Sequence, residues 1–163
     1  MSRKGNGAIE VMVVVGILMA VAVVFGGGHR GHDRTEAWKH SCMSRVKQLN
    51  LAMMMYTQDY DETLPAGNWR SELPTYTGRV LPPAQWYCPA SQARSGYAFN
   101  GTLTGLQAEP YASNTMLYEV GPDGLAYRHN DGMVVGYVDG HARWSSQATV
   151  SKWQPTNLIS LVP

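Results

Sequence analysis

The sequence predicts an α+β fold, in which a long amino-terminal helix packs on a small head built around an antiparallel β-sheet. An almost continuous apolar run fills residues 8–25. Helical periodicity returns over residues 35–61, and short β-type segments separated by tight-turn signals fill residues 115–146. With 163 residues, the chain has room for one such domain beside the first half of the helix.

The apolar run predicts a membrane-spanning first half of the helix, over residues 6–25. As a helix, residues 8–25 would be about 27 Å long, because each residue adds about 1.5 Å, and this length crosses a hydrocarbon core. Arg3 and Lys4 precede the run, which places the amino end in the cytoplasm and the rest outside. We therefore expect a single-pass inner-membrane protein, N-in and C-out, with a periplasmic or extracellular head. A secretory signal peptide is the alternative.

Glu10 is the one charged residue in this run. A carboxylate inside a membrane span costs about 2–3 kcal/mol or more, so such a residue is usually retained for a function. On the residues alone two interpretations stay open. Either a positive partner compensates the charge, or the side chain reaches up to the lipid head groups.

Four glycines within residues 26–34 predict a hinge, because each weakens a helix by up to about 1 kcal/mol relative to alanine. A second, amphipathic helix is expected over residues 35–61, with Asp33 or Thr35 as its cap and an end before Pro65. Its apolar side chains recur every three or four residues along one face, at Trp38, Cys42, Val46, Leu49, Met53, Tyr56 and Tyr60.

The rest of the head, residues 35–163, is expected to place an antiparallel sheet against this helical stripe. The segment Asn-Asp-Gly at 130–132 and the pair Asp139-Gly140 mark hairpin turns, because these residue types tolerate positive φ. The predicted segments are loops at 62–114, strands at 115–120, 125–129, 133–138 and 141–145 within the sheet region 115–146, and a tail at 147–163 with an edge strand at 157–162.

Composition argues against several classes of function. The formal net charge is +1 and no basic run is present, so nucleic acid is not expected as a partner. We find no set of motifs for a nucleophile, a base and an oxyanion pocket, no phosphate loop and no zinc-type cysteine cluster in the sequence. The chain is therefore not expected to be an enzyme or to need a cofactor.

The two cysteines, Cys42 and Cys88, lie 46 positions apart. An oxidising compartment would permit a disulfide between them. Two unrelated buried thiols are an equal alternative, because the sequence does not show whether their Cα atoms meet.

Two groups of polar residues are candidate ion sites. Asp59, Asp61 and Glu62 follow one another at the end of the second helix, and Ca²⁺ would suit such oxygen ligands. Solvated carboxylates with a turn or a surface salt bridge are the more ordinary interpretation.

Histidines and aspartates in the predicted hairpins form the second group. His129 and His141 could meet on neighbouring strands and, with Asp131 and Asp139, form a metal or acid–base site. Because each aspartate precedes a glycine, a turn-forming role is favoured.

Four blocks of sequence follow one another along the chain. A basic leader, MSRKG, precedes NGAIEVMVVVGIL, and SCMSRVKQLNLAMMMYTQDYDETLP (41–65) follows. WYCPAS and SGYAFNGTLTG come next, and then His129, nine residues and Asp139-Gly140. In this order the blocks resemble the type IV pilin-like and pseudopilin family, and the last one matches the H-X9-DG signature of prepilin-type proteins.

The resemblance implies processing and assembly. A prepilin peptidase would cut after Gly5, removing the leader 1–5, and Asn6 would be methylated. The new α-amino group could then pair with Glu10 on the same or a neighbouring subunit. The implied function is a structural subunit of a type IV pilus or type II secretion pseudopilus, with other pilin-like subunits, the peptidase and inner-membrane lipid as partners. A monomeric membrane-anchored or secreted binding module is the alternative.

Overall fold

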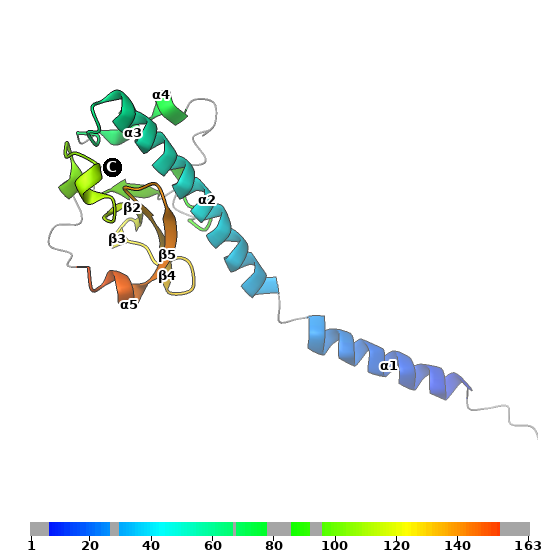
Figure 1. Cartoon of the computed structure of the whole chain (residues 1–163). Coiled ribbons are helices and arrows are strands. Elements are labelled where there is room, and N and C mark those ends of the chain that lie inside the picture. Colours follow the sequence, from blue (N-terminus) through cyan, green and yellow to red (C-terminus); the bar gives the residue numbers. More distant parts are fainter. Residues whose placement is uncertain (1–6, 27–29, 67, 78–85, 92–95, 154–163) are drawn as a thin grey trace, which may run out of the picture. The chain divides into compact units, whose positions relative to one another are not determined.

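The computed structural model describes residues 7–26, 30–66, 68–77, 86–91 and 96–153, and within the first helix the side chains of residues 10–21. The chain divides into two compact units, residues 1–34 and residues 35–163. The second unit combines helices with an antiparallel sheet (Figure 1), which confirms the predicted α+β class.

The first helix, α1 (Gly7–Gly26), is apolar except for one acid in its first turn, Glu10. Among the described residues no helix is long and apolar enough to cross a membrane. The predicted membrane span over residues 6–25 and the inner-membrane localisation are therefore wrong.

The second helix, α2 (Arg30–Asp59), begins earlier than expected. Residues 30–34, predicted as part of the hinge, are helical, and the expected caps at Asp33 and Thr35 therefore lie inside the helix. A single internal glycine costs at most about 1 kcal/mol, which propagation from the packed part of a helix can offset. After α2 the chain turns through positive φ at Asp61 and Glu62, at 50° and 58°.

Helix α2 lies against the sheet (Figure 1), and its apolar stripe supplies one side of the main core. Its buried members are Cys42, Val46, Leu49, Met53 and Tyr56, each at most 8% exposed. Trp38 is half-buried. At the carboxyl end the stripe reaches solvent, because Tyr60 is 52% exposed and stacks on Tyr56 at 4.2 Å between ring centroids.

The sheet has five strands, all paired antiparallel. Four strands follow the order β1-β2-β4-β5, and β3 pairs with the far end of β2. Their bounds are β1 (Tyr97–Phe99), β2 (Thr115–Gly121), β3 (Gly124–Leu125), β4 (Gly132–Tyr137) and β5 (Ala142–Ser146).

Parts of the head differ from the expectation. The predicted strand 125–129 is reduced to the two residues of β3, and β1 lies within the predicted loop region. That region also contains α3 (Trp69–Glu72), α4 (Pro74–Thr77) and two 3-10 turns, and the predicted tail begins with α5 (Gln147–Val150). The expected edge strand at 157–162 lies outside the described residues.

Alternation along β2 sends side chains to opposite faces of the sheet. Leu117 belongs to the core shared with α2, whereas Tyr118 belongs to a second core beneath α5. Glu119 follows in the alternation, so its side chain points to the same face as Leu117. An acid therefore occupies a core position, and it is fully buried.

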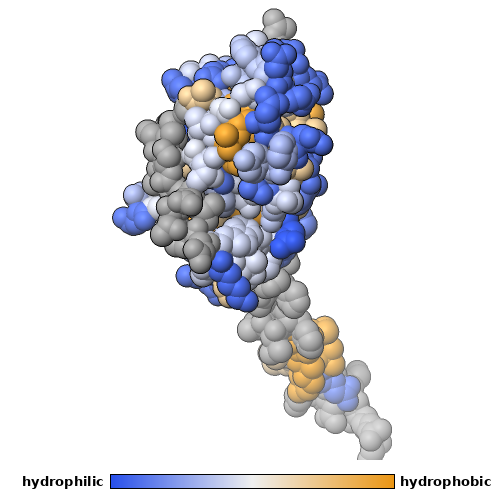
Figure 2. Space-filling view, turned by 60° about the vertical axis from the view of Figure 1, so that its left-hand side comes forward, coloured by the Kyte–Doolittle hydropathy of each residue, from blue (hydrophilic) through white to orange (hydrophobic). Residues whose placement is uncertain are grey.

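The surface of the two units differs in hydropathy. In Figure 2 the described part of α1 is predominantly hydrophobic, whereas the visible face of the head is mostly hydrophilic with small apolar areas. The head therefore buries most of its large apolar side chains in its own cores, whereas the described apolar side chains of α1 are exposed.

Candidate functional site

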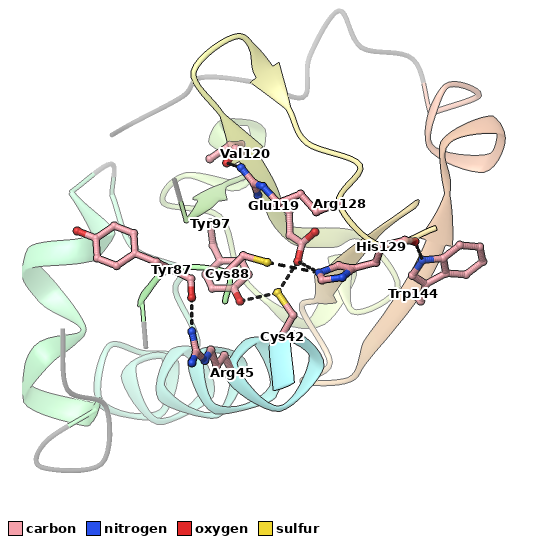
Figure 3. Close-up of polar contacts among 10 residues, drawn as sticks. All are labelled: Cys42, Arg45, Tyr87, Cys88, Tyr97, Glu119, Val120, Arg128, His129 and Trp144. Atoms are coloured by element: carbon pink, nitrogen blue, oxygen red, sulfur yellow. Dashed lines mark hydrogen bonds and ion pairs between the residues drawn. The ribbon is translucent and has the colours of Figure 1, made fainter. Parts of the chain in front are cut away.

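Four potential metal or proton ligands meet inside the head: Cys42, Cys88, Glu119 and His129. Cys42 lies on α2, Cys88 in the segment before β1, Glu119 on β2 and His129 in the turn before β4. One ligand atom from each lies within 4.8 Å of the others, and the four side chains point toward one another (Figure 3). All four residues are at most 2% exposed.

The contacts converge on two atoms (Figure 3). Glu119 Oε1 accepts a hydrogen bond from Cys42 Sγ at 2.5 Å and lies 3.0 Å from His129 Nε2. The same nitrogen lies 3.4 Å from Cys88 Sγ. The Tyr97 hydroxyl contacts Cys42 Sγ at 2.9 Å.

A tight turn positions His129. Asn130 and Asp131 adopt positive φ, at 51° and 54°, and the backbone N–H groups of His129 and Gly132 donate to each other's carbonyls at 3.0 and 3.2 Å. The Trp144 indole donates to the His129 carbonyl at 2.7 Å. These bonds hold the imidazole over the core side of the sheet.

The segment that carries Cys88 is tied to α2. Arg45, one turn after Cys42, donates to the Tyr87 carbonyl at 2.5 Å. Asn130, on the turn beside His129, donates to Glu36 Oε1 at 2.8 Å. Hydrogen bonds on both sides of the four-residue cluster thus connect it to the same helix.

The two thiols are in opposite electrostatic situations. Burial raises the pKa of Cys42, so this thiol keeps its proton and donates it to Glu119. Hydrogen bonding to Cys42 lowers the pKa of Cys88 despite its burial. The difference favours a Cys88 thiolate beside the imidazole.

The acid and the imidazole also shift. Burial raises the pKa of Glu119, against the effect of its hydrogen bond with His129. Burial lowers the pKa of His129, but hydrogen bonds to Cys88 and Glu119 outweigh this effect and raise its pKa to about 9. The His129 side chain is therefore favoured as the protonated imidazolium, between the Glu119 carboxyl group and the Cys88 thiolate.

This geometry does not resemble a catalytic relay. In a nucleophile–histidine–acid triad the nucleophile and the acid contact different nitrogens of the imidazole. Here both Cys88 and Glu119 approach Nε2. Donors that converge on one point suit a bound cation better than a chain of proton transfers.

The structure brings together some of the residues singled out by the sequence. Cys42 and Cys88 meet, and both are free thiols. His129 lies with them, but Asp139 of the same motif does not.

Asp139 instead pairs with His141. Its Oδ1 accepts from the His141 N–H at 3.1 Å and lies 2.5 Å from His141 Nδ1. Both side chains are nearly half exposed, at 44% and 49%, and Gly140 between them has φ 91°. The two histidines are therefore in separate environments, and Asp139 has the expected turn geometry.

The three acids at the end of α2 are exposed and do not form a ligand group. Asp59 accepts a hydrogen bond from the Tyr76 hydroxyl at 2.9 Å, whereas Asp61 and Glu62 occupy the left-handed turn. Glu62 and Asp139 both line a surface pocket of about 230 Å³. In the described part of the chain, the one group of three or more clustered ligands is the buried one.

The remaining predicted residues belong to the amino-terminal unit. Glu10 is exposed on α1. Gly5 and Asn6, where the resemblance places cleavage and methylation, lie outside the described residues.

Sequence reasoning missed Glu119 and Tyr97. A signal existed for the first of these: Glu119 interrupts TMLYEV, an otherwise mostly apolar strand, and shares a strand face with the apolar Leu117. An acid at such a position needs a buried partner.

The chain matches no protein-family model, no curated protein and no solved structure. Its function is therefore inferred from its residues and their geometry.

Proposed function

We propose that the chain is a structural subunit of a filament of the type IV pilus or type II secretion pseudopilus kind, assembled by packing α1 of many copies together. One observation carries the proposal: α1 exposes large apolar side chains around its whole circumference. The exposed fractions range from 46% to 78% for Val11, Met12, Val13, Val14, Val15, Ile17, Leu18, Met19 and Val21.

The distribution of these side chains favours many neighbours over one. Successive residues of an α-helix are about 100° apart, so a run of apolar residues has no polar face to leave in water. Burying each such side chain stabilises by about 1.5–3 kcal/mol. A single groove would cover one side of α1, whereas a bundle of identical helices covers all of it.

Glu10 supplies a reason for a defined register. It is the one charged side chain among the described residues 10–21 of α1, and a carboxylate buried between helices is strongly unfavourable without a partner. Cleavage between Gly5 and Asn6, as the resemblance implies, would create a positive amino group about one turn away. Copies packed out of register would leave both charges unmatched.

The head takes no part in chemistry in this proposal. Its buried cysteine, histidine and glutamate are at most 2% exposed, so a substrate does not reach them. The α2 stripe is already covered by the sheet of its own head, which leaves α1 as the assembling surface.

The test is co-expression of the full chain with a prepilin peptidase. We expect the intact mass to show loss of residues 1–5 and gain of one methyl group, and the product to sediment as filaments visible by electron microscopy. Glu10→Gln should be cleaved normally, while its polymerised fraction falls at least about tenfold, since an unmatched buried charge costs several kcal/mol.

Glu109→Gln is the matched control, because Glu109 is an exposed acid on the head. It should assemble like the unmodified chain. A chain that keeps its first five residues in the presence of the peptidase, or a Glu10→Gln variant that polymerises as well as the control, would overturn the proposal.

A further inference from the structure

We propose that Cys42, Cys88, Glu119 and His129 bind one divalent transition-metal ion, with zinc preferred, as a structural centre of the head. Metal binding would displace the protons that Cys42 and His129 carry in the metal-free head. Two thiolates, a neutral imidazole and a carboxylate then make a set of four donors of the types that zinc takes. Their sequence spacing follows no zinc-finger pattern, so the site is visible only in the folded chain.

The four ligand atoms lie within 4.8 Å of one another, and the three closest contacts are at or below the spacing of a tetrahedral site. With zinc–sulfur bonds of about 2.3 Å and zinc–nitrogen or zinc–oxygen bonds of about 2.0–2.1 Å, ligand atoms stand roughly 3.3–3.8 Å apart. The sulfur of Cys88 and Nε2 of His129 are 3.4 Å apart, and Nε2 and Glu119 Oε1 are 3.0 Å apart. Cys42 Sγ, 2.5 Å from Oε1, would move outward by about 1 Å to make room for the ion.

A buried carboxylate oxygen without a hydrogen bond supports the presence of a bound cation. Glu119 Oε2 is buried and, within the part of the chain that the structure describes, accepts no hydrogen bond. Buried carboxylates are otherwise paired or bound to a metal. A divalent cation among the four donors would offset two of the three negative charges of the carboxylate and the two thiolates.

The surroundings would orient the ligands. Tyr97 contacts Cys42 Sγ, and Trp144 holds the His129 carbonyl. Such outer contacts fix ligand orientation in metal sites. The four ligands come from separate segments, so one ion would connect α2 to β2 across 77 positions of sequence.

A Cys42–Cys88 disulfide is the competing use of the same thiols. It would satisfy two side chains and leave Glu119 and His129 as an isolated buried pair. In a disulfide, Cys42 could no longer donate a hydrogen bond to Glu119. Cys88 could no longer act as a thiolate partner of His129 Nε2. Metal binding uses all four side chains at once, and we therefore favour it.

The test is cobalt and zinc titration of the reduced, chelator-treated full chain. We expect one ion per chain, tetrahedral d–d bands in the visible spectrum and a thiolate-to-cobalt charge-transfer band in the near ultraviolet. Zinc should displace the cobalt and raise the melting temperature, because an ion that binds only the folded state stabilises it.

Substitutions separate the ligand types. Cys88→Ser should lower zinc affinity by more than about 100-fold, since loss of even an outer contact costs about 10–100-fold, and should halve the charge-transfer intensity. Glu119→Gln should weaken binding at least about tenfold yet keep the full thiolate band. The double variant D139N/H141Q, which removes the exposed pair, should bind like the unmodified chain.

Two results would overturn the inference. One is a folded, reduced chain that shows no thiolate–cobalt band at saturating cobalt, whatever the variants do. The other is freshly purified chain without metal whose mass is lower by two hydrogens until a reductant is added, which would establish the disulfide.

Discussion

The described part of the head contains two histidine–carboxylate pairs, one near each end of β4, and their environments are opposite. Glu119 and His129 are fully buried, with Nε2 and Oε1 3.0 Å apart. Asp139 and His141 are each nearly half exposed. An imidazole and a carboxylate therefore form part of the buried core at His129 and Glu119, and a local contact within a turn at His141 and Asp139.

Their surroundings explain the difference. The buried pair is joined by two thiols and bordered by Tyr97. The exposed pair is joined by a glycine at φ 91° and by the Tyr137 ring, which stacks on His141 at 4.0 Å between centroids. Solvent screens the interaction between Asp139 and His141. The charges of Glu119 and His129 instead depend on burial and on the hydrogen bonds with the two cysteines.

The largest contrast should appear when each histidine is removed. In metal-free protein, His129→Ala leaves Glu119 buried without its partner and should lower the free energy of unfolding by about 3–5 kcal/mol. His141→Ala should lower it by less than about 1 kcal/mol, because exposed ion pairs contribute little. Urea unfolding followed by circular dichroism measures both.

Equal losses from the two alanine variants would show that burial does not distinguish the pairs. A His129→Ala variant that is as stable as the unmodified protein would likewise show that burial does not distinguish the two pairs.

An intermediate effect is expected from the support of the buried pair. A Cβ added at Gly132 would overlap the Trp144 indole, which donates to the His129 carbonyl. Gly132→Ala should therefore cost about 1–3 kcal/mol through overpacking. Thermal and urea unfolding give the measurement.

Gly121→Ala is the matched control, since its added Cβ would meet other atoms at 3.5 Å or more. It should cost clearly less than Gly132→Ala. If Gly132→Ala and Gly121→Ala lowered the free energy of unfolding equally, the position of the Trp144 indole against the His129 turn would not contribute to stability.

The smallest effect should come from Asp139→Asn. The amide oxygen can still accept from the His141 N–H, which now bonds to Asp139 Oδ1 at 3.1 Å. We expect a change below about 0.5 kcal/mol in the free energy of unfolding. A double-mutant cycle with His141→Gln measures the coupling directly, and a coupling above about 1 kcal/mol would contradict the solvent-exposed character of this pair.

Local patterns predicted much of the head. The three- and four-residue spacing from Cys42 to Tyr56 indicated the buried stripe of α2, because side chains at this spacing share one helix face. The Asp139-Gly140 pair indicated a turn, since its glycine takes positive φ without strain. Both signals arise among neighbours in sequence.

Other elements were not predictable by the same reasoning. The strand Tyr97–Phe99 has three residues, too few for a periodic signal, and it forms because β2 offers a paired edge. The start of α2 at Arg30 was missed because glycine propensity is a weak guide beside a long packed helix. The apolar run had indicated a membrane span, but among the described residues no helix is long and apolar enough to cross a membrane.

The sequence by itself determined the α+β class, the helical stripe and the turn at Asp139-Gly140, because periodicity and turn preference act between residues a few positions apart. Only the tertiary structure decided that Cys42, Cys88, Glu119 and His129 share one buried space. The residues that contact one another in this cluster are separated by 10 to 77 positions in the sequence. Their contacts form only when α2 packs on the sheet and the turn at Asn130 brings His129 back over the core.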